Sequence, residues 1–171
     1  MAKKTTVKAT ALKYGTVGGD ATTPLMGVLK GLTVGQDEPD STEIEAEFFD
    51  TPFDIFYDGN PVTLNFELAN YDLTELPALF GGSVADDVYE GAPAAFTTEH
   101  SWQLEFGRGN FALYIYKGLT VGTIKKDEDG ALNFSVTITA LMHETTTGTG
   151  NDAVTTQHMY KIVGTKPTTK P

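Results

Sequence analysis

The strongest constraint on the fold is a strict alternation of apolar and polar residues in segment 131–142. Successive side chains of a β-strand point to opposite faces of a sheet, so such alternation predicts a strand with one buried face. The apolar positions are Leu132, Phe134, Val136, Ile138 and Ala140. The positions between them form a polar face that consists of Asn133, Ser135, Thr137 and Thr139.

Four further segments predict strands because they combine β-branched and aromatic residues with an alternating pattern. They are residues 42–49, 62–68, 101–106 and 111–117. The charged stretch 126–130 predicts the turn of a long hairpin, because Gly130 at its end is free to adopt a positive φ. The chain therefore predicts a mainly antiparallel β domain.

One short helix is predicted over residues 73–80, on an apolar stripe of Leu73, Leu76, Leu79 and Phe80. The glycine pair 81–82 ends it. Asp72 or Thr74 can cap its start, and Pro77 favours Thr74 because proline fits best within the first turn. The turn-rich segment 83–95 predicts a loop or another short helical piece.

The composition places the chain among compact domains and excludes several classes of site. A length of 171 residues suits one domain, and 40% hydrophobic residues are too many for a disordered chain. The formal net charge of −11 favours a soluble protein and argues against a basic nucleic-acid grip. No apolar run reaches the roughly 18 residues of a membrane span, and no signal peptide is recognisable, so an intracellular protein is expected. The absence of cysteine excludes disulfides and thiolate chemistry.

The charge is unevenly distributed along this single domain. Residues 1–13 carry four lysines and no acid, and residues 158–171 carry three lysines and no acid. The part between them holds all 23 acidic residues, nine of which fall within 37–58. Basic arms on an acidic body suit contacts between copies, with the arms of one copy on the body of the next. The alternative is two solvated chain ends.

A six-residue sequence occurs twice, as Lys-Gly-Leu-Thr-Val-Gly at residues 30–35 and again at residues 117–122. Each copy follows an apolar pair and leads through an acidic turn into an alternating segment, 42–49 in the first case and 131–142 in the second. The repeat predicts two related hairpins that extend the same sheet. A chance coincidence of common strand residues is the alternative.

The predicted strand 42–49 carries three glutamates on one face, at Glu43, Glu45 and Glu47. Like charges on one face repel one another, so they are either a solvated outer face that protects a sheet edge from aggregation or a surface that keeps a polyanion from binding.

Catalytic and metal-binding patterns are missing from the sequence. The three histidines lack the spacing of metal ligands, and no serine lies in a nucleophile elbow. Residues 107–110 read as a tight turn between strands and lack the Lys and Ser/Thr of a phosphate loop. No cofactor is expected, and an enzyme is not predicted.

The chain resembles the major tail tube proteins of long-tailed bacteriophages from about residue 28 to residue 163. The resemblance is carried by the order of several elements: Pro-Phe-Asp-Ile-Phe-Tyr-Asp-Gly-Asn-Pro at 52–61, the strand 62–68, the short helix with its Gly-Gly stop, Trp-Gln-Leu-Glu-Phe at 102–106, the strand 111–117 and the closing hairpin. It implies an antiparallel β-sandwich or barrel subunit with one short flanking helix. Two hairpins of each subunit would join those of its neighbours in an inner barrel shared around a hexameric ring, and rings would stack into a tube.

The resemblance also implies a virion protein that is made in the host cytoplasm and conducts DNA to the host. Its partners would be further copies, a tape measure protein in the lumen during assembly, a tail terminator, and baseplate or distal tail proteins. DNA would pass transiently, and no membrane contact is implied. The lumen-facing candidates are Glu43, Glu45, Glu47, Asn133, Ser135, Thr137 and Thr139. Candidate contacts between rings are Asp37, Glu38 and Asp40 at the tip of the first hairpin, together with Lys3, Lys4, Lys8, Lys161 and Lys166.

Two other readings stay open. One is the tube of a contractile injection system, which would share the barrel and differ by a sheath partner. The other is a small ligand- or carbohydrate-binding β-sandwich, for which exposed aromatic residues would be needed. Its candidates are Phe56, Tyr57, Tyr89 and Trp102.

Overall fold

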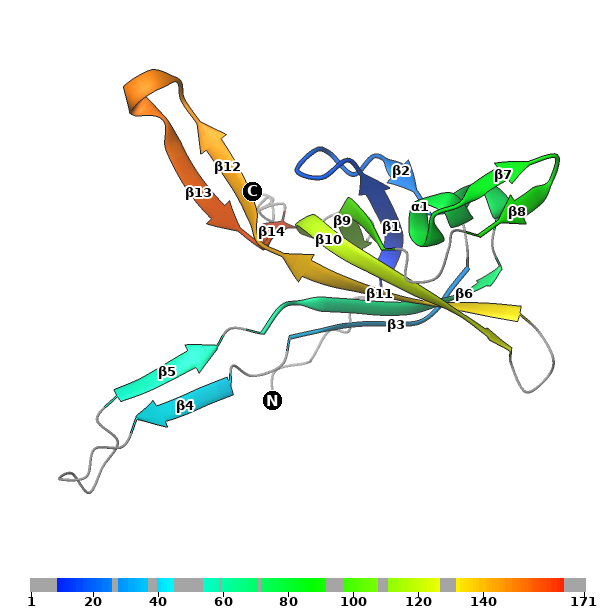
Figure 1. Ribbon diagram of the computed structural model, residues 1–171, viewed down its shortest axis with the longest axis horizontal. Coiled ribbons are helices and arrows are strands. Elements are labelled where there is room, and N and C mark those ends of the chain that lie inside the picture. Colours follow the sequence, from blue (N-terminus) through cyan, green and yellow to red (C-terminus); the bar gives the residue numbers. More distant parts are fainter. Residues whose placement is uncertain are drawn as a thin grey trace, which may run out of the picture.

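A computed structural model describes residues 9–25, 28–36, 40–44, 54–58, 60–70, 72–91, 97–107, 111–126 and 132–164. The described chain is mainly antiparallel β structure with one short α-helix, as predicted (Figure 1). The main sheet contains β1 (Ala9–Gly15), β2 (Thr23–Pro24), β3 (Val28–Gly35), β6 (Thr63–Asn70), β9 (Thr98–Phe106), β10 (Phe111–Lys126), β11 (Leu132–Leu141) and β14 (Tyr160–Gly164). Three separate hairpins are β4 (Asp40–Ile44) with β5 (Asp54–Asp58), β7 (Ser83–Ala85) with β8 (Val88–Glu90), and β12 (His143–Thr147) with β13 (Val154–His158).

The 16-residue strand β10 joins two parts of the main sheet. Its first five residues pair with β9 on one side and with β14 on the other. From Lys117 onward it pairs with β11 instead of β14. A β-bulge between Ile115 and Gly118 interrupts its register with β9 near this change of partner. The sheet therefore divides into a part with the order β2-β1-β9-β10-β14 and a part with the order β10-β11-β6-β3.

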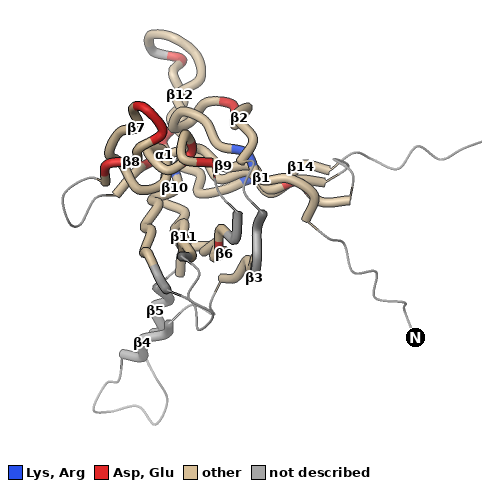
Figure 2. Tube along the Cα trace, turned by 90° about the vertical axis from the view of Figure 1, so that its right-hand side faces the viewer, with Lys and Arg blue, Asp and Glu red and all other residues tan. Residues whose placement is uncertain are grey.

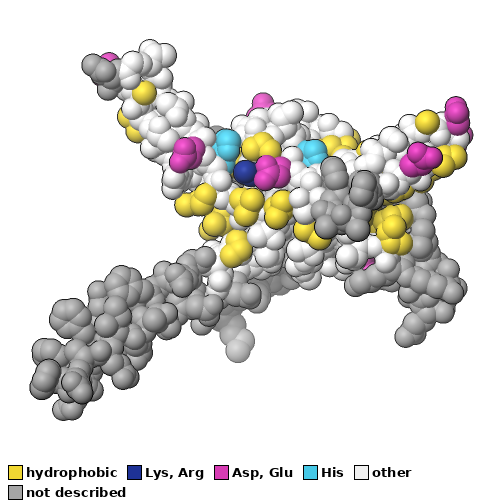
Figure 3. Space-filling view, in the orientation of Figure 1, with side chains coloured by type: hydrophobic (Ala, Val, Ile, Leu, Met, Phe, Trp, Pro, Cys, Tyr) yellow, Lys and Arg dark blue, Asp and Glu magenta, His cyan; other side chains and the backbone are white. Residues whose placement is uncertain are grey.

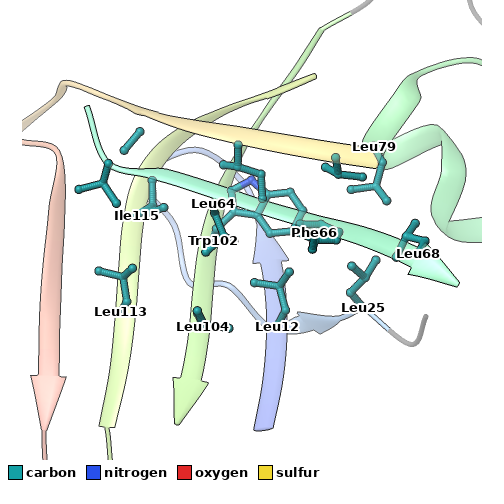
Figure 4. Close-up of a cluster of buried hydrophobic side chains, with 14 of the residues drawn as sticks. Leu12, Leu25, Leu64, Phe66, Leu68, Leu79, Trp102, Leu104, Leu113 and Ile115 are labelled. Carbon is teal, nitrogen blue, oxygen red and sulfur yellow. The ribbon is translucent and has the colours of Figure 1, made fainter. Parts of the chain in front are cut away.

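The hydrophobic core lies between these two parts of the sheet. Figure 4 shows β6 running across β1 and β9, with the labelled side chains of all three strands pointing into the space between them. Trp102 on β9 is 1% exposed, and its ring centre lies 6.5 Å from that of Phe66 on β6. The predicted alternation is confirmed for residues 133–140, because Phe134, Val136, Ile138 and Ala140 are all buried. The side chain of Leu132 lies outside the described residues.

The predicted helix is present, but its start differs from the prediction. Residues Leu73–Glu75 form a 3₁₀ turn and Leu76–Phe80 the α-helix α1, which ends at Gly81 with a φ of 69°. The cap is Asp72 rather than Thr74, because the Asp72 carboxylate accepts hydrogen bonds from the Thr74 N–H at 2.9 Å and from its hydroxyl at 2.8 Å. The preference for Thr74 failed because it assumed an α-helical first turn, whereas a tighter 3₁₀ turn precedes Pro77.

Segment 83–95 was predicted as a loop or helical piece and instead begins with the β7–β8 hairpin. The two turn residues, Asp86 and Asp87, have positive φ values of 50° and 60°. This is the pattern of a two-residue hairpin turn, which is usually signalled by Asn-Gly or Asp-Gly and was concealed here by an Asp-Asp pair. The hairpin is tied to the end of α1, because the Tyr89 hydroxyl donates to the Gly81 carbonyl at 2.9 Å.

The repeated hexapeptide does not form two equivalent hairpins. The second hairpin is confirmed by the continuous pairing of β10 with β11 from Lys117 to Lys126. The first is wrong, because β3 pairs with β6 and β4 pairs with β5. Residues 37–39, at the centre of the segment predicted as the tip of the first hairpin, lie outside the described chain. Figure 1 shows the β4–β5 hairpin reaching away from the main sheet beyond β3 and β6. The predicted strand 42–49 begins within β4, and its residues 45–49 lie outside the described chain.

Two tyrosines make the fold sensitive to alkaline pH. Burial raises the pKa of Tyr14, and the nearby Glu75 raises it further. Burial is also the main cause that raises the pKa of Tyr114, whose hydroxyl donates to the Gly19 carbonyl. A group with a raised folded-state pKa contributes stability that is present below its unfolded pKa and lost as the pH rises through the folded value.

We therefore expect the free energy of unfolding to fall as the pH rises above about 10, the ordinary pKa of tyrosine. Urea denaturation at a series of pH values measures this slope. The double variant Tyr14→Phe/Tyr114→Phe should show a shallower slope, and Tyr160→Phe, in exposed β14, is the matched control. An unchanged slope in the double variant would contradict the assignment to these two side chains.

Candidate functional site

The second part of the sheet is a ribbon of four antiparallel strands, and its two faces differ in burial and polarity. We call this set the four-stranded ribbon: residues 117–126 of β10, then β11, β6 and β3. One face is buried against β1 and β9 and carries Leu64, Phe66 and Leu68 of β6 together with the apolar residues of β11. The opposite face is turned away from the core. Within the described chain, the ribbon therefore presents mainly this second face and its two edges to other molecules.

The outward face of the ribbon is mostly polar, although Leu119 and Val121 of β10 also lie on it, opposite Thr139 and Thr137. The predicted polar residues of β11 all lie on it and are half-buried: Asn133, Ser135, Thr137 and Thr139. The register places Glu67, Asn65 and Thr63 of β6 directly opposite the last three of these. The Thr137 hydroxyl donates to the Asn65 side-chain oxygen at 2.8 Å. Polar groups on this face thus hydrogen-bond across neighbouring strands.

Two lysines share register positions with this polar face. Lys30 of β3 stands opposite Glu67, and Lys125 of β10 stands opposite Asn133. Sequence reasoning named only acidic and uncharged polar residues here and missed both lysines. The missing signal was strand register, because only the pairing reveals which residues of distant strands lie side by side.

The predicted glutamates lie away from this face. Glu43 belongs to β4 and stands opposite Ile55 of β5, in a two-stranded sheet separate from the ribbon. Glu45 and Glu47 lie outside the described residues. The structure therefore does not bring Glu43 onto the same sheet face as Asn133.

The predicted arms are shorter than expected, because their inner residues belong to the main sheet. On the N-terminal side, Lys13 lies in β1 and forms an ion pair of 2.6 Å with Glu105. On the C-terminal side, Lys161 lies in β14, and its Nζ is 4.5 Å from the ring centre of Tyr114. Asp40 is the first residue of β4. The other predicted contact residues lie outside the described chain: Lys3, Lys4, Lys8, Asp37, Glu38 and Lys166.

Both edges of the ribbon are open within the described part of the chain. β3 pairs with β6 on one side, and no described strand pairs with its other side. At the opposite edge, β9 pairs with β10 only as far as Thr120, which leaves residues 121–126 unpaired on that side. An exposed apolar residue marks each edge on the core-facing side, with Val34 42% exposed and Ile124 60% exposed. Open edges of this kind are templates for pairing with another chain.

The described residues include several of a type that could contribute to a metal or a sugar site. They contain no group of three or more potential metal ligands close enough to hold an ion. His100 is half-buried, packs its ring against Tyr14 and contacts the Ala78 carbonyl at 2.9 Å, so these contacts account for it as a structural residue. Trp102 is buried rather than exposed, so it cannot contribute to an aromatic binding surface. The side chains of Phe56 and Tyr57 lie outside the described residues.

Comparison with models of known protein families gives no match, and comparison with curated protein sequences gives none either. Within the described residues, no helix has the length and apolar character needed to cross a membrane. Inference about function therefore rests on the ribbon, its edges and its polar face.

Proposed function

We propose that this protein is a self-assembling structural subunit of a bacteriophage tail tube, which forms stacked hexameric rings around a channel for DNA. One observation carries the proposal: within the described residues, the four-stranded ribbon has two open edges, one face covered by its own subunit, and one mostly polar face. The ring size and the phage setting come from the resemblance of element order described above.

Strand direction supports closure of the ribbon into a ring. Each strand of the ribbon is antiparallel to the next, so β3 runs antiparallel to β10. A copy rotated about a ring axis therefore presents residues 121–126 of its β10 to β3 in the direction that continues the antiparallel order. Val34 of one copy and Ile124 of the next, which are both exposed in the single chain, would cover each other in this contact. Closure removes both open edges, which is how barrels avoid edge-to-edge aggregation.

The covered face of the ribbon supports the polar face as the lining of the proposed channel. The apolar face is buried by β1 and β9 of the same subunit, so those strands must lie outside a barrel made from these ribbons. The polar face then lines the lumen, with Asn133, Ser135, Thr137 and Thr139 along β11. On this face hydroxyls, amides and Glu67 outnumber the two lysines at its register positions, Lys30 and Lys125, and the face also includes the apolar Leu119 and Val121. Such a lumen would not be dominated by the basic side chains that grip phosphates. DNA would slide past such a surface.

The remaining parts of the proposal follow from the tube. The tape measure protein would occupy the same lumen during assembly, and the terminator and the baseplate or distal tail proteins would bind the two ends of the stack. The protein would reside in the virion after synthesis in the host cytoplasm. A sheath protein as partner would instead favour a contractile injection tube.

We expect electron microscopy of the purified full-length chain at rising concentration to show hollow rings or tubes. The expected rings have six subunits, and native mass spectrometry measures that number independently. Globular particles that remain monomeric at every concentration up to the solubility limit would contradict self-assembly as the function. Aggregates without a central channel would contradict the tube.

A further inference from the structure

The segment of residues 154–164 is an exposed strip without acidic residues. It comprises β13, the linking residue Met159, and β14, and it contains one lysine and no Asp or Glu. Every residue of both strands is exposed, including Val154 at 57%, Ile162 at 59% and Val163 at 51%. Figure 3 shows hydrophobic side chains gathered on the surface at the base of the β12–β13 hairpin, where Figure 1 places β14. Exposed apolar surface of this kind marks an interaction site.

The outer edge of β14 lacks the usual protection of an edge strand. β14 pairs with β10 through one edge, and within the described chain no strand pairs with the other. Edge strands are normally protected by proline, by bulges or by charged side chains that point outward. β14 contains no proline, and its pairing with β10 has no bulge. Its one charged residue, Lys161, lies over the rings of Tyr114 and Tyr116.

The strip is held in a fixed position by an aromatic cluster at its centre. His143 and His158 stand opposite each other at the base of the β12–β13 hairpin. Their ring centres lie 6.0 Å and 5.9 Å from that of Tyr116 on β10. Gly18 packs directly against His143, and the Gly18 N–H donates to the Tyr116 carbonyl at 2.8 Å. The hairpin therefore projects from the sheet on an anchored base rather than on a free linker.

We propose that this strip, residues 154–164, is a docking surface for a second copy of the chain, separate from the ring edges. Charge selects the second copy as the occupant. The chain carries a formal net charge of −11, so repulsion between two copies is weakest where carboxylates are few. The strip has none of its own, and Glu144 of β12 borders it by accepting a hydrogen bond from Gln157 at 2.7 Å. Figure 2 shows acidic residues on the β7–β8 hairpin, on the opposite side of the molecule from β14. A basic or neutral strip on one side and acidic surface on the other suit head-to-tail contact, which propagates as a stack.

This inference rests on the proposed function only in that both require self-association, and it assigns the strip to stacking rather than to ring closure. The test compares Ile162→Glu with Val88→Glu in the full-length chain. Both residues are exposed apolar side chains on short strands, at 59% and 56%, so neither change should unfold the protein. Val88→Glu adds the same carboxylate to the acidic β7–β8 hairpin, the surface that would face the strip of the next copy, where an added negative charge should not weaken the contact. The two variants therefore test whether the position of the added charge matters.

Hydrogen exchange at residues 160–164 should slow as the wild-type concentration rises, because a second copy covers the open edge of β14. Ile162→Glu should need at least a tenfold higher concentration for the same protection, and Val88→Glu should behave as the wild type. Electron microscopy of the same samples scores rings and stacks, and Ile162→Glu should retain rings that do not stack.

Each outcome decides between the two proposals. Association without protection of residues 160–164, or unchanged stacking by Ile162→Glu, overturns the docking surface and leaves the ring intact. Protection of the strip without any rings supports the docking surface and contradicts the ring. A chain that never associates contradicts both.

Discussion

Two variants that each block a different edge of the ribbon should pair with each other when mixed, although neither should pair with itself. Val34→Glu blocks the β3 edge and leaves the β10 edge of the same copy intact. Ile124→Glu blocks the β10 edge and leaves the β3 edge intact. Burying an unpaired carboxylate in an apolar contact costs several kcal/mol, so neither variant alone should form rings. In a mixture, β10 of the first variant can still pair with β3 of the second.

The expected product is therefore a heterodimer, since its two remaining edges are both blocked. Native mass spectrometry distinguishes it from homodimers by mass, and light scattering measures its amount against the concentration of each variant. Both positions are exposed, so the stability of the isolated subunit should change by no more than about 0.5 kcal/mol. Adding Ile162→Glu to both variants removes the separate contact proposed for stacking and keeps the test specific to the ring edges.

Two results would contradict the edge pairing. Rings formed by either single variant would show that the blocked edge is not used. A mixture that stays monomeric, when the wild-type chain forms rings under the same conditions, would show that copies meet through other surfaces.

Alanine in place of Gly118 should lower the free energy of unfolding by about 1–3 kcal/mol, the usual cost of overpacking a well-packed core. A Cβ atom at this position would lie 2.6 Å from Trp102 Cδ1 and 2.7 Å from Ile138 Cγ2. Both neighbours are at most 1% exposed, so they cannot move aside into solvent. Gly122 faces the same obstacle, because its Cβ would enter the ring of Phe80 on α1.

The repeated hexapeptide supplies a matched control for this prediction. Gly35 occupies in the first copy the place that Gly122 occupies in the second, yet no atom lies within 4 Å of a Cβ built on it. Gly35→Ala should therefore change stability by no more than about 0.5 kcal/mol. Urea denaturation followed by circular dichroism measures all three variants. Equal losses for Gly35→Ala and Gly118→Ala would contradict a packing role that is specific to the second copy.

The two copies of the hexapeptide illustrate how far a sequence repeat can be interpreted. Both copies lie in strands of the main sheet, and a β-bulge interrupts strand pairing near the start of each. Gly31 in the first copy needs its freedom for a positive φ of 66°, whereas Gly118 in the second needs the space of a missing side chain. Identical residues in the two copies thus have different structural roles, because their neighbours come from distant parts of the chain.

The candidate site was only partly predictable for the same reason. The polar face of β11 could be read from the sequence, because alternation within one strand is a local property. Lys30 and Lys125 could not be placed beside it, since their positions depend on register with β6 and β11. The basic arms were predicted from the distribution of charge alone, which could not show that Lys13 and Lys161 belong to strands of the main sheet.

By itself the sequence determined the mainly β character, the half-buried strand at 131–142, the long second hairpin and the short helix that stops at Gly81. These features arise from side-chain periodicity and from turn and cap residues that act within a few positions. Only the tertiary structure decided that β3 pairs with β6, that β10 changes partner near Gly118, and that no other described strand covers the two ribbon edges. Strand partners are chosen by long-range packing of whole faces against one another, and period-two alternation is equally satisfied by many pairings.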